Sequence, residues 1–276
     1  MAKKDFNSLL QRITTGAAFV AIIIAALLYN AYASFVVFGV AMYFTLIEFL
    51  QMSASRTISK THVNLLKILM MGIYAATYLY AVGTLTISPL YWLIPFFIIL
   101  AITEMFNKGE DTFHNISTAV LGLVYIILPF SLVNIMINMG GEFNGLILLI
   151  VFFLIWINDS FAYLFGVSLG KHRLCERISP KKSWEGFIGG GVMTLTLSAL
   201  AAHFYFQDIS LEIMGLAVIV VLFGTLGDLF ESQLKRHFGV KDSGTALPGH
   251  GGFLDRLDSF LFIIPIAIVY LQIIAA

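Results

Sequence analysis

Hydrophobic positions along this chain gather in long apolar runs separated by short polar connections. Nine of these runs approach the roughly twenty residues that a helix needs to cross the hydrocarbon core of a bilayer. The predicted spans cover residues 12–29, 32–50, 65–83, 89–104, 116–138, 145–166, 186–206, 212–231 and 256–275. The pattern predicts an all-α fold, a polytopic transmembrane helical bundle of about nine spans. Pro95, Pro129 and Pro265 lie inside spans and are expected to kink them.

Composition supports the membrane class and excludes a water-soluble globule. Hydrophobic residues make up 59% of the 276 residues and charged residues 12%, and the mean hydropathy is +0.92. A soluble domain carries about a quarter charged residues, so too few polar side chains are present to cover a water-facing surface. The single cysteine, Cys175, excludes an internal disulfide.

The first apolar run has an alternative interpretation as a cleaved signal peptide. Lys3 and Lys4 precede it, and Ala31-Tyr32-Ala33 resembles a signal-peptidase site. A second apolar run follows at once from Ser34, with no soluble segment to release. We therefore expect a retained transmembrane helix.

The basic residues lie on one side of the predicted bundle. All 16 Lys and Arg residues fall before or at the start of the first span, or in alternate connections and the adjoining span ends, whereas the connections around 84–88, 140–144 and 207–211 contain none. Cytoplasmic loops are enriched in Lys and Arg. The pattern predicts a multi-pass protein of the cell (inner) membrane, with a cytoplasmic amino terminus and an outside carboxyl terminus.

Acidic residues also concentrate on the predicted inner side. All but Glu142, Asp208 and Glu212 of the 16 acids lie there, and several are inside helix ends. Such carboxylates cost at least about 2.5–3.5 kcal/mol each to insert and are usually functional. The acids at inner helix ends are Glu48, Glu104, Asp159, Glu185, Asp228, Glu231, Asp255 and Asp258.

Two long inner loops, 167–185 and 232–254, have room for polar chemistry. We expect an amino-terminal region of transmembrane helices (1–115) and a carboxyl-terminal region (116–276) that carries both loops. The second loop combines cations with a glycine-rich turn that leads into a helix. Glycines allow backbone N–H groups to approach a ligand, and helix amino termini favour anions.

Asp255 and Asp258 follow this loop and, three residues apart, share one face of the starting helix. Carboxylates beside phosphate-binding cations indicate Mg²⁺, which binds one or two carboxylates together with phosphate oxygens. The sequence therefore predicts a site for a metal-bound polyphosphate at the membrane surface. The alternative is a merely positive inner loop, which would need no glycine turn.

Residues Ser232 to Asp258 resemble the signature of the phosphatidate cytidylyltransferase family, S-x-x-K-R-x4-K-D-x-G-x2-L-P-x-H-G-G-x2-D-R-x-D. The first long loop is also similar to that family through Ile178–Gly186, where Ser183 stands at a position that is often Thr. The resemblance is strong over the carboxyl-terminal half. It implies an enzyme of phospholipid biosynthesis that converts CTP and phosphatidate into CDP-diacylglycerol and pyrophosphate, with Mg²⁺ as cofactor and a second cation as an open alternative.

The resemblance also implies roles for individual residues. We predict metal ligation by Asp228 and Asp255, with Asp159 as a further ligand. The predicted catalytic residues are Asp228, Lys235, Asp255, Arg256 and Asp258. The predicted substrate-binding residues are Ser179, Lys181, Lys182, Arg236, Lys241, His250, Gly251 and Gly252. Asp159 and Asp258 have the alternative role of orienting Lys or Arg, and His250 that of holding the turn.

The expected partners are CTP, phosphatidate and the lipid bilayer, with no nucleic acid. The glycines at 186 and 189–191 permit close helix packing, either within the subunit or across a homodimer. Two other functions remain open: a CTP-dependent lipid or polyprenol kinase, which attacks the γ-phosphorus, and an ion-coupled transporter. A transporter is expected to place its charges near the bilayer midplane, often in two repeats, and neither feature is evident here.

Overall fold

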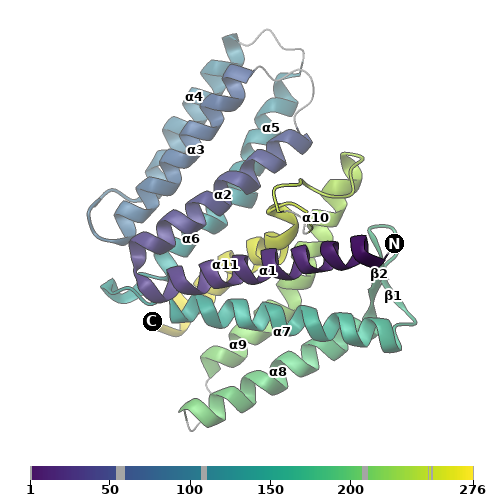
Figure 1. Ribbon diagram of the computed structural model, residues 1–276. Coiled ribbons are helices and arrows are strands. Elements are labelled where there is room, and N and C mark those ends of the chain that lie inside the picture. Colours follow the sequence, from purple (N-terminus) through teal and green to yellow (C-terminus); the bar gives the residue numbers. More distant parts are fainter. Residues whose placement is uncertain are drawn as a thin grey trace. The chain divides into compact units, whose positions relative to one another are not determined.

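The computed structural model describes residues 2–53, 60–106, 111–206, 211–247, 249 and 251–275, with side chains described from residue 13 onward except 60–62, 205 and 206. Nearly all of this chain is helical (Figure 1). The longer helices are α1 (Ala2–Tyr29), α2 (Ala31–Ser53), α3 (Lys60–Ala81), α4 (Leu93–Phe106), α5 (Thr112–Gly122), α6 (Leu128–Met136), α7 (Leu146–Leu169), α8 (Trp184–Phe206), α9 (Leu211–Ile219), α10 (Thr225–His237) and α11 (Leu254–Ala275).

The helices agree with the predicted spans. Among the described residues, 8 helical stretches are long and apolar enough to cross a membrane, and α1 adds a shorter apolar stretch, Ile13–Tyr29. The helical membrane class is therefore confirmed, and the expected number of spans fits. The direction of the chain across the membrane stays a prediction.

Two of the long spans each contain a π-helical turn, and in one of them a proline follows that turn. The span 112–141 joins α5 and α6 through the π-helical turn η2 (Leu123–Ile127), and Pro129 follows in the first turn of α6. Proline has no N–H to donate and crowds the preceding turn, so a widened turn lets the helix continue. The turn η4 (Val220–Gly224) joins α9 to α10 in the same way. There are also two 3₁₀ turns: η1 (Pro89–Trp92) directly precedes α4, and η3 (Met139–Gly141) follows α6.

The chain forms two compact units. The first contains residues 1–146 and 242–256, and the second contains residues 147–241 and 257–276. In the first unit, α2 packs against α1, α3, α5 and α6, and Figure 1 shows α3 and α5 running alongside it. Met42, Leu46 and Phe49 of α2 have no exposed surface. This helix therefore forms the centre of the first unit's core.

Glycines bring the helices of the second unit into close contact. A Cβ on Gly190 of α8 would lie 3.0 Å from the backbone nitrogen of Ala162 in α7, and one on Gly227 of α10 would lie 2.6 Å from the carbonyl oxygen of Asp258 in α11. Gly189 packs in the same way against Phe165. Small residues let helix backbones approach within a membrane. The glycines of α8 thus pack within the chain.

The loop 167–185 contains a two-stranded antiparallel hairpin that the sequence pattern did not indicate. Strand β1 (Arg173–Cys175) pairs with β2 (Ser179–Ser183) at the end of α7 (Figure 1). The strands are too short for a hydrophobic alternation to be recognisable. Along β2, Pro180 and Lys181 are exposed, Lys182 is half-buried and Ser183 is buried. The hairpin therefore turns Lys182 inward.

Candidate active site

An ion pair in the second unit joins the hairpin to α10. The ammonium nitrogen of Lys182 lies 2.6 Å from Oδ2 of Asp228, and the two side chains are 27% and 36% exposed. Such a short contact between partly exposed groups is a charge-assisted hydrogen bond that a ligand can still reach. Two residues predicted to act on substrate and metal are thus brought together.

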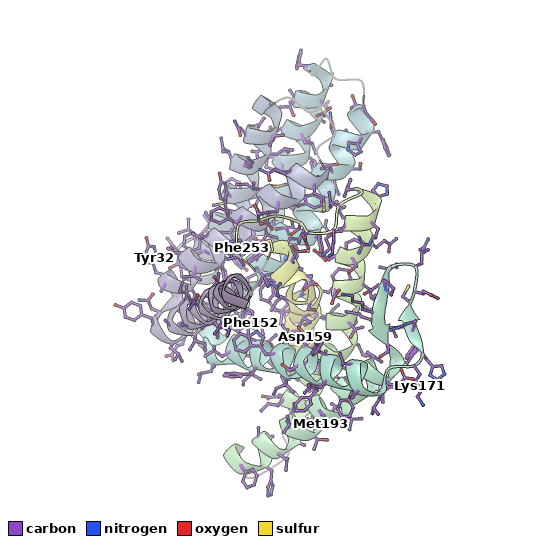
Figure 2. All side chains as sticks on the ribbon, turned by 45° about the vertical axis from the view of Figure 1, so that its right-hand side comes forward. Tyr32, Phe152, Asp159, Lys171, Met193 and Phe253 are labelled. Atoms are coloured by element: carbon purple, nitrogen blue, oxygen red, sulfur yellow. The ribbon has the colours of Figure 1, made fainter. Side chains whose placement is uncertain are left out.

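Two further predicted acids surround this pair. Asp159 of α7 interacts electrostatically with both Lys182 and Asp228, and Asp258 of α11 interacts with Asp159, Asp228 and Lys182. In Figure 2, Asp159 lies between α7 and the yellow ribbon of α11. We call Asp159, Lys182, Asp228 and Asp258 the acidic cluster. Three carboxyl groups and one ammonium group therefore interact with one another there.

Hydrogen bonds orient the carboxylates of the acidic cluster. Ser232 donates its hydroxyl to Oδ1 of Asp228 at 3.3 Å, one turn further along α10. The backbone N–H of Ser259 donates to Oδ1 of Asp258 at 2.7 Å. The Ser259 hydroxyl in turn donates to the carbonyl of Gly224 at 3.0 Å, which ties α11 to the turn before α10. The other oxygen of Asp228, Oδ2, is the one that contacts Lys182.

The acidic cluster fits a metal that is shared with a ligand. Within the described part of the chain, no three Cys, His, Asp or Glu side chains form a ready-made metal cage. Mg²⁺ in phosphate-transferring sites needs none, because it uses one or two carboxylates and completes its shell with water and phosphate oxygens. Asp228, aided by Asp159 or Asp258, has the chemistry to hold such an ion.

The second predicted metal ligand, Asp255, begins α11 and belongs to the first unit. Its Oδ2 accepts hydrogen bonds from the backbone N–H groups of Gly252 at 2.9 Å and Ser243 at 3.1 Å. Gly251 has φ of +83°, which L side chains rarely adopt, and its carbonyl accepts from Leu247 at 3.0 Å. These contacts close the described residues of segment 242–253, which are all but 248 and 250, into a loop that we call the glycine loop.

The remaining predicted residues differ in their surroundings. Lys235 forms a 2.6 Å ion pair with Glu231, which is 1% exposed, one turn earlier on α10. Arg236, Lys241 and Arg256 are exposed, as is Lys181. Ser179 is half-buried at the start of β2, and His250 lies outside the described residues. Glu231 is thus a partner that sequence reasoning noted only as a helix-end acid.

Two residues of the hairpin region were given no role from the sequence. Glu185 of α8 accepts hydrogen bonds from the backbone N–H of Lys171 at 3.1 Å and from Nδ1 of His172 at 2.6 Å. The Ser183 hydroxyl accepts from the N–H of Gly186 at 3.2 Å and so caps α8. In Figure 2, Lys171 lies at the end of α7 beside the hairpin. Both residues fix the hairpin that carries Lys182, and the hydroxyl that Ser and Thr share explains why either suits position 183.

The fold and these residues define a class: helical membrane proteins that carry carboxylates and cations at helix ends and also contain a glycine-rich loop. Within that class, the chain belongs to the cytidylyltransferase family, whose sequence pattern matches residues 10–274.

Several relatives carry the name phosphatidate cytidylyltransferase. The chain is 42% identical over 173 residues to the protein of Staphylococcus aureus (strain COL), a match that covers 62% of this chain and 64% of the relative. It is 40% identical over 172 residues to the protein of Staphylococcus haemolyticus (strain JCSC1435), with the same coverage of 62% and 64%. The similarity therefore spans somewhat less than two thirds of the length of these relatives.

Proposed function

We propose that this chain is a Mg²⁺-dependent phosphatidate cytidylyltransferase that uses CTP and phosphatidate to make CDP-diacylglycerol and pyrophosphate. The observation that carries the proposal is the acidic cluster, where Lys182 pairs with Asp228 at 2.6 Å beside Asp159 and Asp258. Family membership and the names of the relatives support the same reaction. The product would serve phospholipid biosynthesis in the cell (inner) membrane.

The reaction transfers a cytidylyl group between two phosphates. An oxygen of the phosphatidate phosphate forms a bond to the α-phosphorus of CTP, and the bond from that phosphorus to the α–β bridging oxygen breaks. Pyrophosphate leaves with the electron pair. The attacking phosphate is already anionic, so the protein needs to position two anions and neutralise their charge rather than remove a proton.

Cationic side chains are suited to that positioning. Lys182 is held by Asp228, and Lys235 is held by Glu231, so both ammonium groups are pre-oriented. The exposed Lys181, Arg236, Lys241 and Arg256 lie in segments that supply charge for the triphosphate or the lipid phosphate. Arg can bind two phosphate oxygens at once. We assign these residues, with Ser179, His250, Gly251 and Gly252, to substrate binding.

Asp228 and Asp255 are the proposed metal ligands, with Asp159 as a further one. Bound Mg²⁺ would neutralise phosphate charge and polarise the phosphorus under attack. Asp258, which interacts with Asp159, Asp228 and Lys182, would keep Lys182 oriented as substrate enters. A second cation remains part of the proposal, because two cations could hold the attacking and leaving oxygens in line.

Phosphatidate-dependent release of pyrophosphate tests the reaction type. Purified protein in detergent, given CTP and Mg²⁺, should release pyrophosphate only when phosphatidate is present. Chelation of the metal should stop the release, and added Mg²⁺ should restore it. Release of CDP in place of pyrophosphate would replace the proposal with a lipid kinase, because a kinase attacks the γ-phosphorus.

A further inference from the structure

Glu48 is a buried acid of α2 whose carboxylate accepts hydrogen bonds from the glycine loop and from the first residue of α11. Its side chain is 4% exposed. Oε2 accepts hydrogen bonds from the backbone N–H of Leu254 at 2.9 Å and from the hydroxyl of Ser243 at 3.3 Å. These partners are 206 and 195 residues away along the chain. A carboxylate so deeply buried is costly unless its contacts stabilise something, and its contacts here are to one loop.

Two glycines of the glycine loop, Gly244 and Gly252, lie against the side chain of Glu48. A Cβ on Gly244 would lie 2.5 Å from Oε1 of Glu48, and its nearest neighbours would all be atoms of that side chain. A Cβ on Gly252 would collide with Oε2 and with the Ser243 hydroxyl. With a side chain at either position, the Glu48 carboxylate would have to move away from the loop backbone.

Ser243 links Glu48 to Asp255. The Ser243 hydroxyl donates to Glu48, and the Ser243 backbone N–H donates to Asp255. An aromatic contact reinforces the same position, since Phe44, one turn before Glu48 on α2, stacks on Phe253 with ring centres 5.2 Å apart and planes 13° apart. Figure 2 shows Phe253 beside α1 and α2.

We propose that Glu48 is a positioning residue that seats the glycine loop on α2 and thereby fixes the carboxylate of Asp255. The inference rests on the proposed function in that Asp255 is taken as a metal ligand. Glu48 acts through hydrogen bonds that it accepts, not by touching metal or substrate. Partners that orient a metal ligand typically change metal affinity or activity by about 10–100-fold when they are removed.

Two substitutions at one position separate positioning from charge. Glu48→Ala removes the acceptor, so the amides of Ser243, Gly252 and Leu254 should exchange hydrogen faster, and the Mg²⁺ concentration for half-maximal turnover should rise by about 10–100-fold. Glu48→Gln keeps an oxygen for the N–H of Leu254 and should stay within a few-fold of the wild type in both measurements. Glu104→Ala removes an equally buried acid, 3% exposed, that accepts from Asn115; it should leave both measurements unchanged.

A double substitution tests the contact itself. Gly244→Ala in the wild-type chain should push the loop off Glu48 and raise the Mg²⁺ requirement about as much as Glu48→Ala does. In a Glu48→Ala chain the space is vacant, so Gly244→Ala should add nothing. Additive effects of the two substitutions would overturn the proposal, because residues that do not share a contact add.

Amide exchange distinguishes failure of the inference from failure of the proposed function. Unchanged exchange of the loop amides in Glu48→Ala would overturn the role of Glu48, whatever the turnover. Equal loss in Glu48→Gln and Glu48→Ala would also overturn it, in favour of a direct role for the charge. Faster loop exchange in a chain whose wild type makes no CDP-diacylglycerol would support the seating role and reject the proposed reaction.

Discussion

Lys182 is the residue on which the balance of charge in the acidic cluster depends. Its ammonium is the cation that interacts with Asp159 and Asp258, and it lies 2.6 Å from Asp228. Without it, three carboxylates would face each other in a partly dehydrated space. Breaking an ion pair costs about 3–5 kcal/mol when fully buried and less than about 1 kcal/mol when exposed. This half-exposed pair should fall between those limits.

Lys182→Met is therefore expected to lower turnover at least tenfold and to lower the free energy of unfolding by about 1–3 kcal/mol. Thermal denaturation in detergent and CDP-diacylglycerol formation measure the two effects. Lys67→Met, at a half-buried lysine of α3 in the first unit, is the control and should keep full turnover. Equal turnover of the two variants would contradict the role of Lys182.

Asp255→Asn is expected to keep the fold and membrane insertion but to abolish Mg²⁺-dependent turnover. The amide oxygen of Asn can still accept from Gly252 or Ser243, so the loop should keep its conformation, whereas the charge that we propose to bind a metal is lost. Gel filtration and α-phosphate transfer from CTP measure the two effects. Full activity in a folded variant would exclude Asp255 as a metal ligand.

At the residue scale, the sequence predicted the types of group in the site but few of their partners. Asp228, Asp255 and Lys182 follow from the resemblance to the cytidylyltransferase family, and the two acids also lie at helix ends, where a carboxylate is costly. Glu48 is also an acid at a helix end, where burial of a carboxylate is costly. Its partner Ser243 is 195 residues away along the chain, and no local sequence pattern predicts a contact over that separation. Glu185 and Glu231 are similar, since their partners depend on where a hairpin or a helix turn brings them.

At the scale of elements, the separation of α10 and α11 determines where Asp228 lies. Gly227 precedes Asp228 and leaves room for the backbone of α11, where a Cβ would come within 2.6 Å of the carbonyl oxygen of Asp258. Backbone atoms cannot move aside as a flexible side chain can. Any side chain at position 227 must therefore push the two helices apart.

Gly227→Ala is expected to lower the free energy of unfolding by about 1–3 kcal/mol, since forced overpacking costs that much, and to lower turnover by displacing Asp228. Gly72→Ala is the matched control, because a Cβ at Gly72 in α3 would meet nothing within 4 Å. That substitution should stabilise the helix by about 0.5–1 kcal/mol. Thermal unfolding and turnover of both variants measure these effects. A Gly227→Ala chain as stable and active as the wild type would refute the packing argument.

Hydropathy predicted the helices well because the bilayer imposes their length and their internal hydrogen bonding. The hairpin β1–β2 was not predicted, since three and five residues are too few for a periodic signal. The sequence predicted a kink at Pro129 but not the π-helical turn that precedes this residue. Sequence patterns thus specify where a helix is strained, and packing decides how the strain is relieved.

At the scale of the whole molecule, the arrangement of charge predicts the side on which the enzyme works. All Lys and Arg residues lie in the amino-terminal segment or in alternate connections and the adjoining span ends, which indicates a cytoplasmic face for both long loops. In sealed vesicles, CTP offered to the face with the basic loops should therefore be used, and CTP offered to the opposite face should not. Accessibility of a reagent to Cys175 in the hairpin reports the orientation of the vesicles independently. Use of CTP only from the opposite face would reverse the predicted topology.

The identity of the phosphorus that is attacked tests the central claim most directly. Purified protein would receive phosphatidate, Mg²⁺ and CTP labelled in either its α- or its γ-phosphate. The account predicts that the α-label enters lipid and that the γ-label appears in pyrophosphate. Entry of the γ-label into lipid would contradict the account and indicate a kinase, and no transfer of either label by folded protein would contradict it in favour of a transporter.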